Sequence, residues 1–449
     1  MTHALPTYPA YRDSGVDWLG EIPAHWEMWK ISHIFRRIGS GTTPPSDEQH
    51  WYEGDIPWVQ TSELREVVIR ETGKMVTSEA LARFPALKLF PPATLLVAMY
   101  GATIGRLGIL GVDACVNQAC CALADPDSFD VGFIFYWLLG IRDRMVNLAS
   151  GGGQPNINQE KIKALRVSLP SAQEQRAIAA FLDRETARLD ALIGKKERLL
   201  ALLAEKRAAL ISHAVTKGLD PSVPMRDSGV TWLGEIPAHW GTARISDIAH
   251  SLQTGPFGSQ LHAEEYVTDG IPIINPAHLR GSRIQPDRDC TVDQATWLRL
   301  ARHELLEGDI IFARRGEMGR CALVTTIEQG WLCGSGSLRL RPKRDLADPV
   351  FLSWMFSTSG VAEWLSLESV GTTMDNLSAK IIGQVPLPIP PLSEQLTIAD
   401  YLNLESGRIN GLSNKVTDAI EKLREYRAAL IAAAVTGKID VRGEAAVHE

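Results

Sequence analysis

Residues 12–26 read RDSGVDWLGEIPAHW, and residues 226–240 read RDSGVTWLGEIPAHW. The two stretches differ only where Asp17 of the first is Thr231 in the second. A match of this length within one chain does not arise by chance, so the sequence is an internal duplication. The fold must therefore contain two related units in tandem.

A second match lies late in each half of the chain. Glu-Gln at 174–175 and Arg-Ala-Ala-Leu-Ile at 207–211 recur, with the same spacing and no gap, at 394–395 and 427–431. The segment between the two short motifs therefore has the same length in both halves.

Between these matches the two halves are less similar, but their glycine-containing stretches still correspond. Residues 100–106 resemble 315–320 with one residue extra, and 150–157 resemble 369–377. A repeat whose frame is kept and whose interior has diverged indicates two halves that perform the same kind of task on different targets.

The composition is that of a globular protein with more than one domain. A length of 449 residues exceeds what one hydrophobic core usually organises. Hydrophobic content of 45% is ordinary, and no apolar run approaches the roughly 20 residues of a membrane span. Residues 1–10 lack a basic segment followed by an apolar core, so we expect no secretion signal and a cytoplasmic location.

The net charge restricts any contact with nucleic acid. The formal charge is −7 and the pI is about 5.9, whereas neutralising DNA phosphates needs a positive surface. A DNA site must therefore be a local basic patch, or be helped by a partner. The six cysteines form no C-x-x-C pair, so we expect reduced core thiols rather than a metal site.

Two stretches that follow proline-closed segments are predicted to be long helices. Ser171 and Ser393 stand where helix caps are expected, and Glu174 follows Ser171 by three residues as in a capping box. Beyond these caps, apolar residues step by threes and fours as in a coiled coil.

The two helices are expected to pair with each other, antiparallel. Glu185 and Glu405 interrupt the two apolar seams at matching positions, which disfavours a self-assembling zipper. The expected helix-pair interface consists of Ile178, Leu182, Leu189, Leu192, Leu199, Leu203, Leu210, Ile398, Leu402, Ile409, Leu412, Val416, Leu423 and Leu430.

The rest of each half alternates short β-like runs with helical stretches and Gly or Pro turns, which predicts an α+β globule. We therefore expect two globular domains joined by a pair of long antiparallel coiled-coil helices, as a pseudo-twofold internal repeat. The predicted segments are a first domain at 1–170, a helix at 171–216, a linker at 217–224, a second domain at 225–390, a helix at 391–436 and a tail at 437–449.

Motifs for catalysis are missing from the sequence. Residues 275–278, Asn-Pro-Ala-His, only superficially resemble the tetrapeptide with which methyltransferases grip an amino group, and no glycine-rich cofactor turn accompanies them. No P-loop and no carboxylate cluster suited to a nuclease metal is found either. We therefore expect no catalytic residue, no metal ligand and no cofactor bound by this chain, and we disfavour a stand-alone DNA methyltransferase.

A weaker, positive signal for DNA contact lies in the loops. Arginines flank the glycine turn at Gly316, an arginine occupies the equivalent first turn, and amide side chains suited to adenine edges lie nearby. Charged loops are also commonly just solvated, and the matching asparagines of the two halves also suit a structural turn. The candidate DNA-binding residues are Arg106, Gln154, Asn156, Asn158, Ser259, Gln260, Arg314, Arg315, Arg320 and Asn376.

Taken together, these motifs resemble the specificity subunit of type I restriction-modification systems. The likeness rests on the doubled 15-residue motif, Gly-Thr-Thr-Pro at 41–44, Gly-Pro-Phe-Gly-Ser at 255–259, Ile-Pro-Trp at 56–58 and Pro-Leu-Ser-Glu-Gln at 391–395. It covers essentially the whole chain.

The resemblance implies two target-recognition domains, each reading one half of a split, asymmetric DNA sequence, with two central helices as spacer. It also implies three kinds of partner. These are double-stranded DNA, two modification subunits that carry S-adenosylmethionine, and motor-nuclease subunits that carry ATP and Mg²⁺. A competing hypothesis is a coiled-coil adaptor without a nucleic-acid role. It explains the helices and the net charge, but not why two globules share a frame and differ inside.

Overall fold

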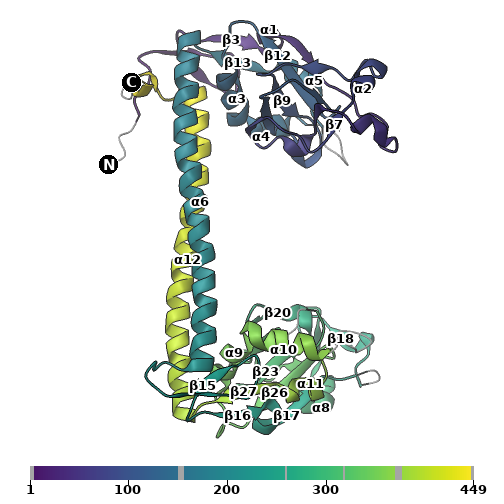
Figure 1. Ribbon diagram of the computed structural model, residues 1–449, viewed down its shortest axis with the longest axis vertical. Coiled ribbons are helices and arrows are strands. Elements are labelled where there is room, and N and C mark those ends of the chain that lie inside the picture. Colours follow the sequence, from purple (N-terminus) through teal and green to yellow (C-terminus); the bar gives the residue numbers. More distant parts are fainter. Residues whose placement is uncertain (1–4, 150–155, 258–259, 317–318, 370–376, 446–449) are drawn as a thin grey trace. The chain divides into compact units, whose positions relative to one another are not determined.

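The computed structural model describes residues 5–149, 156–257, 260–316, 319–369 and 377–445. The chain divides into two compact units. Unit 1 comprises residues 1–197 and 418–449, and unit 2 comprises residues 198–417. Each unit therefore contains one globule and a stretch of each long helix (Figure 1). In the described part of the chain, no helix is both long enough and apolar enough to cross a membrane.

The main sheet of unit 1 has five strands in the order β4-β12-β9-β10-β6. All neighbours are antiparallel except β10 and β6. Its strands are β4 (Phe35–Gly39), β12 (Cys120–Pro126), β9 (Leu95–Ala98), β10 (Leu107–Leu110) and β6 (Val67–Ile69). A second sheet contains β7 (Met75–Val76), β5 (Ile56–Val59), β11 (Ala114–Val116) and β8 (Leu89–Phe90).

Unit 2 repeats this arrangement with one strand fewer in the main sheet, whose order is β17-β26-β23-β24. These strands are β17 (Ala249–Thr254), β26 (Ser337–Pro342), β23 (Ile310–Ala313) and β24 (Cys321–Leu323), all antiparallel to their neighbours. The second sheet contains β18 (Tyr266–Val267), β22 (Thr291–Val292), β19 (Ile271–Ile274) and β25 (Leu332–Cys333).

Short ribbons and helices complete each globule. The two-stranded ribbons pair β1 (Tyr11–Asp13) with β2 (Glu21–Pro23), β3 (Glu27–Lys30) with β13 (Arg166–Leu169), β14 (Met225–Asp227) with β15 (Glu235–Pro237), β16 (Gly241–Arg244) with β27 (Pro386–Ile389), and β20 (Leu279–Arg280) with β21 (Arg283–Ile284). The short helices are α1 (Ile31–Ile34), α2 (Ser78–Arg83), α3 (Val131–Gly140), α4 (Arg142–Asn147), α5 (Gln159–Ala164), α7 (Ile245–Ile248), α8 (Gln294–Leu300), α9 (Pro349–Phe356), α10 (Ser359–Ser369) and α11 (Ala379–Gln384). The predicted α+β class is confirmed.

The two long helices are α6 (Ala172–Lys217) and α12 (Leu392–Val435), and they run antiparallel within each unit (Figure 1). In unit 1, Arg427 pairs with Asp190 and Arg424 pairs with Glu197, so positions descend along α12 as they ascend along α6. In unit 2, the backbone at Gly218, just after α6, lies beside Glu394 at the start of α12.

The duplicated motif holds the beginning of a long helix in each unit. In unit 1, the Glu174 carboxylate accepts hydrogen bonds from Trp26 Nε1 at 3.1 Å and from His25 Nε2 at 2.9 Å. In unit 2, Glu394 makes the same two contacts with Trp240 and His239 at 3.1 and 2.9 Å. The motif therefore has the same structural role in both halves, because it attaches the beginning of one long helix to the globule.

The glutamines beside these glutamates attach the helices to the globules. Gln175 Oε1 accepts from the backbone N–H of Asp130 at 2.9 Å, and Gln395 Oε1 accepts from that of Asp348 at 2.8 Å. Asp130 and Asp348 are the N-caps of α3 and α9. A buried amide thus fixes the start of one helix against the start of another, which satisfies backbone donors that would otherwise be orphaned.

Most of the expected helix-pair residues lie in the interior. Leu210 and Leu423 are half-buried. The buried members are Ile178, Leu182, Leu189, Leu203, Ile398, Leu402, Ile409, Val416 and Leu430.

The prediction is wrong for Leu192, Leu199 and Leu412, which are exposed. After Leu189 the seam continues through Ile193, which is buried. A step of four rather than three residues is needed here, because each residue turns the helix by about 100° and the seam must stay on one face. An apolar residue stands at each of the adjacent positions 192 and 193, so the pattern alone did not determine the phase.

Candidate nucleic-acid interface

One end of the main sheet gathers several loops in each unit. In unit 1, the antiparallel strands place the ends of β4 and β9 beside the starts of β12 and β10. In unit 2, the ends of β17 and β23 lie beside the starts of β26 and β24. We call these loops the turn edge, defined as residues 40–44, 99–106, 117–119 and 156–158 in unit 1, and 255–257, 260, 314–316, 319–320, 334–336 and 377–378 in unit 2.

The two turn edges share their backbone bonds. Ile157 N–H donates to the Met99 carbonyl at 2.9 Å, and Leu377 N–H donates to the Arg314 carbonyl at 2.9 Å. These bonds make residue 99 the structural equivalent of 314, and residue 100 the equivalent of 315.

The central turn of each edge depends on glycines. Gly101 and Gly105 have φ of 60° and 74°, and Gly316 and Gly319 have φ of 85° and 80°. Residues with a side chain rarely adopt this left-handed backbone, so these positions favour glycine. The turns are closed alike, because Ala98 N–H donates to the Arg106 carbonyl and Ala313 N–H to that of Arg320.

In unit 1, Arg106 and Asn156 both lie on the turn edge. Arg106 is half-buried, and its side chain makes no hydrogen bond or ion pair with any residue in the described ranges. Asn156 forms an isolated antiparallel bridge with Tyr100. Asn158 has a structural task, because its Oδ1 accepts from the Lys161 N–H at 2.9 Å as the N-cap of α5. Gln154 lies outside the described residues.

In unit 2, the three arginines differ in their surroundings. Arg314 donates from Nε to the Leu377 carbonyl at 2.9 Å and from Nη1 to the Ser335 carbonyl at 3.4 Å. Burial, and then the charge of Arg315, lower the pKa of Arg314. Arg315 is exposed, whereas Arg320 is half-buried.

The other candidate DNA-binding residues of unit 2 have polar, uncharged side chains. Gln260 closes a turn with Phe257, since its Oε1 accepts from the Phe257 N–H at 3.2 Å and its N–H donates to the Phe257 carbonyl at 3.0 Å. Ser259 and Asn376 lie outside the described residues.

Sequence reasoning missed two aromatic residues on the turn edges. Tyr100 is 45% exposed, and Phe257 is 51% exposed. The Arg314 guanidinium lies 5.1 Å from the centre of the Phe257 ring, within the range of a cation–π contact. An aromatic residue inside a glycine-rich loop was the available signal, because such loops seldom bury large side chains.

The loops of unit 1 are joined by polar side chains. Thr43 donates to Gln118 at 2.5 Å, and Gln159 donates to Ser40 at 2.8 Å. An added Cβ at Gly41 would lie 1.6 Å from the Val116 carbonyl oxygen, so only glycine permits this close approach. The turn edge is therefore a built surface whose loops hold one another in place.

Comparison with known proteins identifies the family. The family described as "Type I restriction modification DNA specificity domain" matches the chain twice, over residues 23–201 and residues 237–422. The chain belongs to this family.

Relatives of similar length support the assignment. The specificity subunit of the type I restriction enzyme MjaVIII from Methanocaldococcus jannaschii is 21% identical over 94% of this chain and 94% of its own. That of EcoKI from Escherichia coli is 21% identical over 95% of this chain and 92% of its own.

Two solved structures share the fold. One, from work on complex assembly and conformational transition of the type I R-M system, has a TM-score of 0.71 and 15% identity, over 92% of this chain and 98% of its own. The HsdS subunit from Thermoanaerobacter tengcongensis has a TM-score of 0.55 and 15% identity, over 93% and 98%. The chain is thus a non-catalytic DNA sequence-specificity subunit of a type I restriction-modification system, which acts with modification and restriction subunits.

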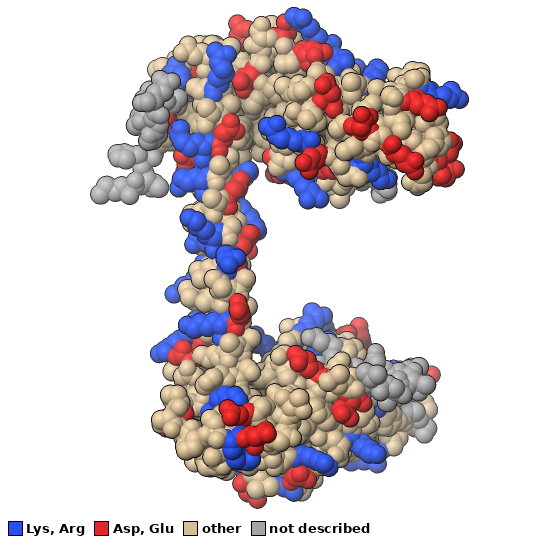
Figure 2. Space-filling view, viewed as in Figure 1, with Lys and Arg blue, Asp and Glu red and all other residues tan. Residues whose placement is uncertain are grey.

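The face drawn in Figure 2 is not uniformly basic. Lys and Arg are interspersed with Asp and Glu over the globules on the face drawn in Figure 2. No group of three or more potential metal ligands is found among the residues that the structure describes. On this face the charges over the globules do not form one broad basic patch.

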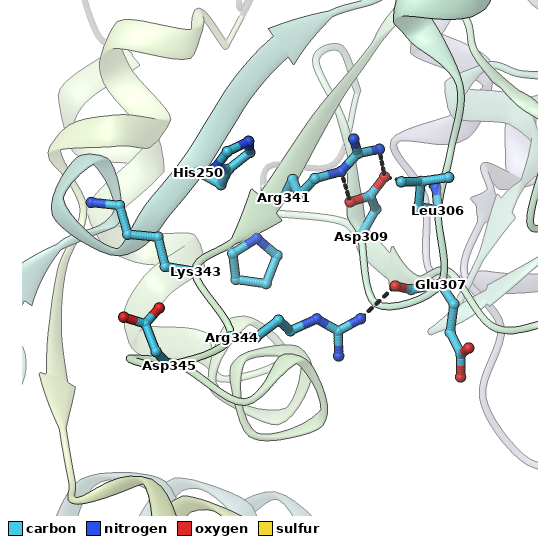
Figure 3. A pocket seen from close by; sticks show the side chains of 9 residues that line it. His250, Leu306, Glu307, Asp309, Arg341, Lys343, Arg344 and Asp345 are labelled. Atoms are coloured by element: carbon cyan, nitrogen blue, oxygen red, sulfur yellow. Dashed lines mark hydrogen bonds and ion pairs between the residues drawn. The ribbon is translucent and has the colours of Figure 1, made fainter.

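A pocket of about 370 Å³ lies at the other end of the main sheet of unit 2 (Figure 3). Arg341 donates twice to the buried carboxylate of Asp309, at 2.8 and 2.7 Å, and Arg344 donates to the Glu307 carbonyl at 2.5 Å. These two arginines are engaged within the specificity subunit itself, and the site also holds acidic side chains. The pocket therefore suits DNA less well than the turn edge does.

Proposed function

We propose that each unit of this specificity subunit reads one half of a bipartite, asymmetric DNA sequence through its turn edge. The observation that carries this proposal is that the two edges share a backbone and differ in their side chains. Met99 and Tyr100 in unit 1 correspond to Arg314 and Arg315 in unit 2. One scaffold with unlike contact residues suits two unlike half-sites.

Arginines that the two turns share are assigned to the phosphate backbone. Arg106 and Arg320 close equivalent turns, because their carbonyls accept equivalent bonds. A residue common to readers of two different sequences carries no sequence information, whereas phosphate contacts are the same on any DNA. Replacing both by alanine should weaken binding on every sequence and flatten the salt dependence of the binding constant. An unchanged salt slope would refute this assignment.

The long helices are proposed to act as the spacer that sets the unread gap. The partners are double-stranded DNA, two modification subunits with S-adenosylmethionine, and motor-nuclease subunits with ATP and Mg²⁺, all in the cytoplasm. The net charge of −7 supports a role for these partners in enclosing the DNA, since this chain alone cannot neutralise many phosphates.

Exchange of one recognition segment tests the proposal. Residues 30–165 are replaced by the corresponding segment of a relative, and the methylated sequences of the host genome are determined with the parent and with the hybrid. Only one half of the bipartite sequence should change. Exchange of residues 245–385 is the matched control and should change only the other half. A change in both halves after either exchange contradicts modular reading.

A further inference from the structure

The two turn edges differ at the residue that follows the shared backbone bond. Tyr100 in unit 1 and Arg315 in unit 2 occupy this equivalent position, and both are exposed. Base readout needs the side chains that vary between the two readers, in contrast to phosphate contact. Position 100 and its equivalent 315 are therefore where sequence selectivity is expected.

The arginine next to this position is directed into the protein. Two of the nitrogens of Arg314 donate to backbone carbonyls of two separate segments, at Leu377 and Ser335. Its guanidinium also packs over the Phe257 ring, and Phe257 is itself fixed by the hydrogen bonds with Gln260. Arg314 thus contacts three other loops of the turn edge, at residues 257, 335 and 377, and holds them together.

Arg315 has the opposite character. Its side chain is exposed and makes no hydrogen bond or ion pair with any other residue that the structure describes. Its backbone is held between the anchored Arg314 and the left-handed turn at Gly316. A charged fork on a fixed backbone is suited to bidentate recognition, because little entropy of the supporting loop is lost on binding.

We propose that Arg315 reads a guanine in the major groove of the half-site bound by unit 2, and that Arg314 is a positioning residue that does not touch DNA. This inference rests on the proposed function. Guanine presents O6 and N7 as two acceptors on its major-groove edge, which match the two parallel donors of an arginine. Tyr100 offers a single hydroxyl and an apolar ring, so unit 1 reads a different base at the equivalent place.

The test uses the complete complex of this chain with its modification subunits and the bipartite sequence determined from host methylation. Each guanine of the two half-sites is replaced in turn by 7-deazaguanine, which removes the N7 acceptor. The wild-type complex should lose about 10- to 150-fold in affinity at one guanine of one half-site, the range for loss of one hydrogen bond to a charged group. The Arg315→Ala complex should bind more weakly and be indifferent to that replacement.

Two variants separate positioning from contact. Phe257→Leu removes the ring beneath Arg314 and leaves every arginine in place, so it should reduce sensitivity to 7-deazaguanine at the same guanine without changing the salt slope. Arg344→Ala, at the other end of the same sheet, is the matched control and should leave that sensitivity unchanged.

The outcomes are distinct. The inference is overturned if Arg315→Ala keeps the sensitivity to 7-deazaguanine, if the variant weakens all sequences equally with a smaller salt slope, or if neither half-site contains a guanine. Failure of the segment exchange would overturn the proposed function itself. Modular half-sites with no effect at Arg315 would overturn this inference alone.

Discussion

Equivalent residues of the two units carry different energetic weight, as Glu174 and Glu394 illustrate. Glu174 is 6% exposed, and it accepts a third hydrogen bond, from the Tyr8 hydroxyl at 2.8 Å. Burial and this carboxylate raise the pKa of Tyr8, so its phenol stays protonated and remains a donor. The Glu394 side chain is 30% exposed, and among the residues that the structure describes it accepts side-chain hydrogen bonds only from the histidine and tryptophan of its motif.

Glu174→Ala should therefore destabilise the protein more than Glu394→Ala. The first change leaves buried donors on Tyr8 and Trp26 without an acceptor, at a cost of about 3 kcal/mol, because an unsatisfied buried group costs about 1–3 kcal/mol. The second should cost about 1 kcal/mol, since only one buried donor, that of Trp240, loses its acceptor. Urea unfolding of the full chain measures both, and equal losses would contradict the difference in burial.

We expect the free energy of unfolding of unit 2 to depend on pH through His303. Burial, followed by the positive charge of Arg302, lowers its pKa to about 4, and its Nε2 accepts from Arg302 Nε at 3.0 Å. The unfolded chain takes up this proton near pH 6.5, so between about pH 6.5 and 4 the unfolded state binds more protons. The stability contributed by neutral His303 is complete above pH 6.5 and is lost as the pH falls toward 4.

The loss should reach at most about 1.4 kcal/mol for each pH unit in this window. His303→Gln keeps an acceptor for Arg302 but cannot titrate, so the difference in unfolding free energy between wild type and variant should shrink as the pH is lowered. Urea unfolding at pH 7, 6 and 5 checks this. A difference that stays constant with pH would show that His303 does not resist protonation.

Adjacent residues of helix α6 differ in burial, and this difference shows which face of the helix forms the seam. Ile193 is buried in unit 1, whereas Leu192 beside it is exposed. Ile193→Ala should cost about 2 kcal/mol, the lower end for loss of a buried aliphatic side chain, and Leu192→Ala less than about 1 kcal/mol. Thermal unfolding of the two variants measures the contrast. A greater loss for Leu192→Ala would restore the seam predicted from sequence.

The sequence pattern was sufficient for long helices and their pairing, because spacing by threes and fours persists over many turns. It was insufficient for the phase at positions 192 and 193, where two apolar residues adjoin and only packing chooses between them. The seam also accepts polar residues, since Thr186 and Ser406 are buried at equivalent positions and Thr186 donates to the Leu182 carbonyl. The Thr186 hydroxyl is satisfied locally by this bond, and neither side chain leaves an apolar mark in the sequence.

The same limit applies to the turn edge. Its glycines and arginines stand out in the sequence, and the structure brings Arg106, Arg315 and Arg320 onto equivalent turns. Whether an arginine faces outward depends on partners far along the chain. Arg314 is held by the carbonyl of Leu377, 63 residues away, and no local pattern predicts that bond.

The proposed function requires one duplicated scaffold to hold two unlike readers at a set spacing on DNA. The helices α6 and α12 are continuous over 46 and 44 residues, and their seams are equivalent along the repeat. A pair of continuous helices resists bending, so their length rather than a flexible linker is proposed to set the gap between the half-sites.

Removal of one matched heptad, residues 196–202 from α6 and residues 416–422 from α12, tests this spacer. Seven residues remove about 10 Å of helix and keep the seam on nearly the same face. The gap in the methylated sequence should shorten by about three base pairs, at about 3.4 Å for each pair, while both half-sequences stay unchanged. Deletion of the heptad from α6 alone is the control, because it puts the two seams out of register and should abolish methylation. An unchanged gap after the matched deletion, or altered half-sequences, would mean that the globules and their partners set the spacing and the helices do not.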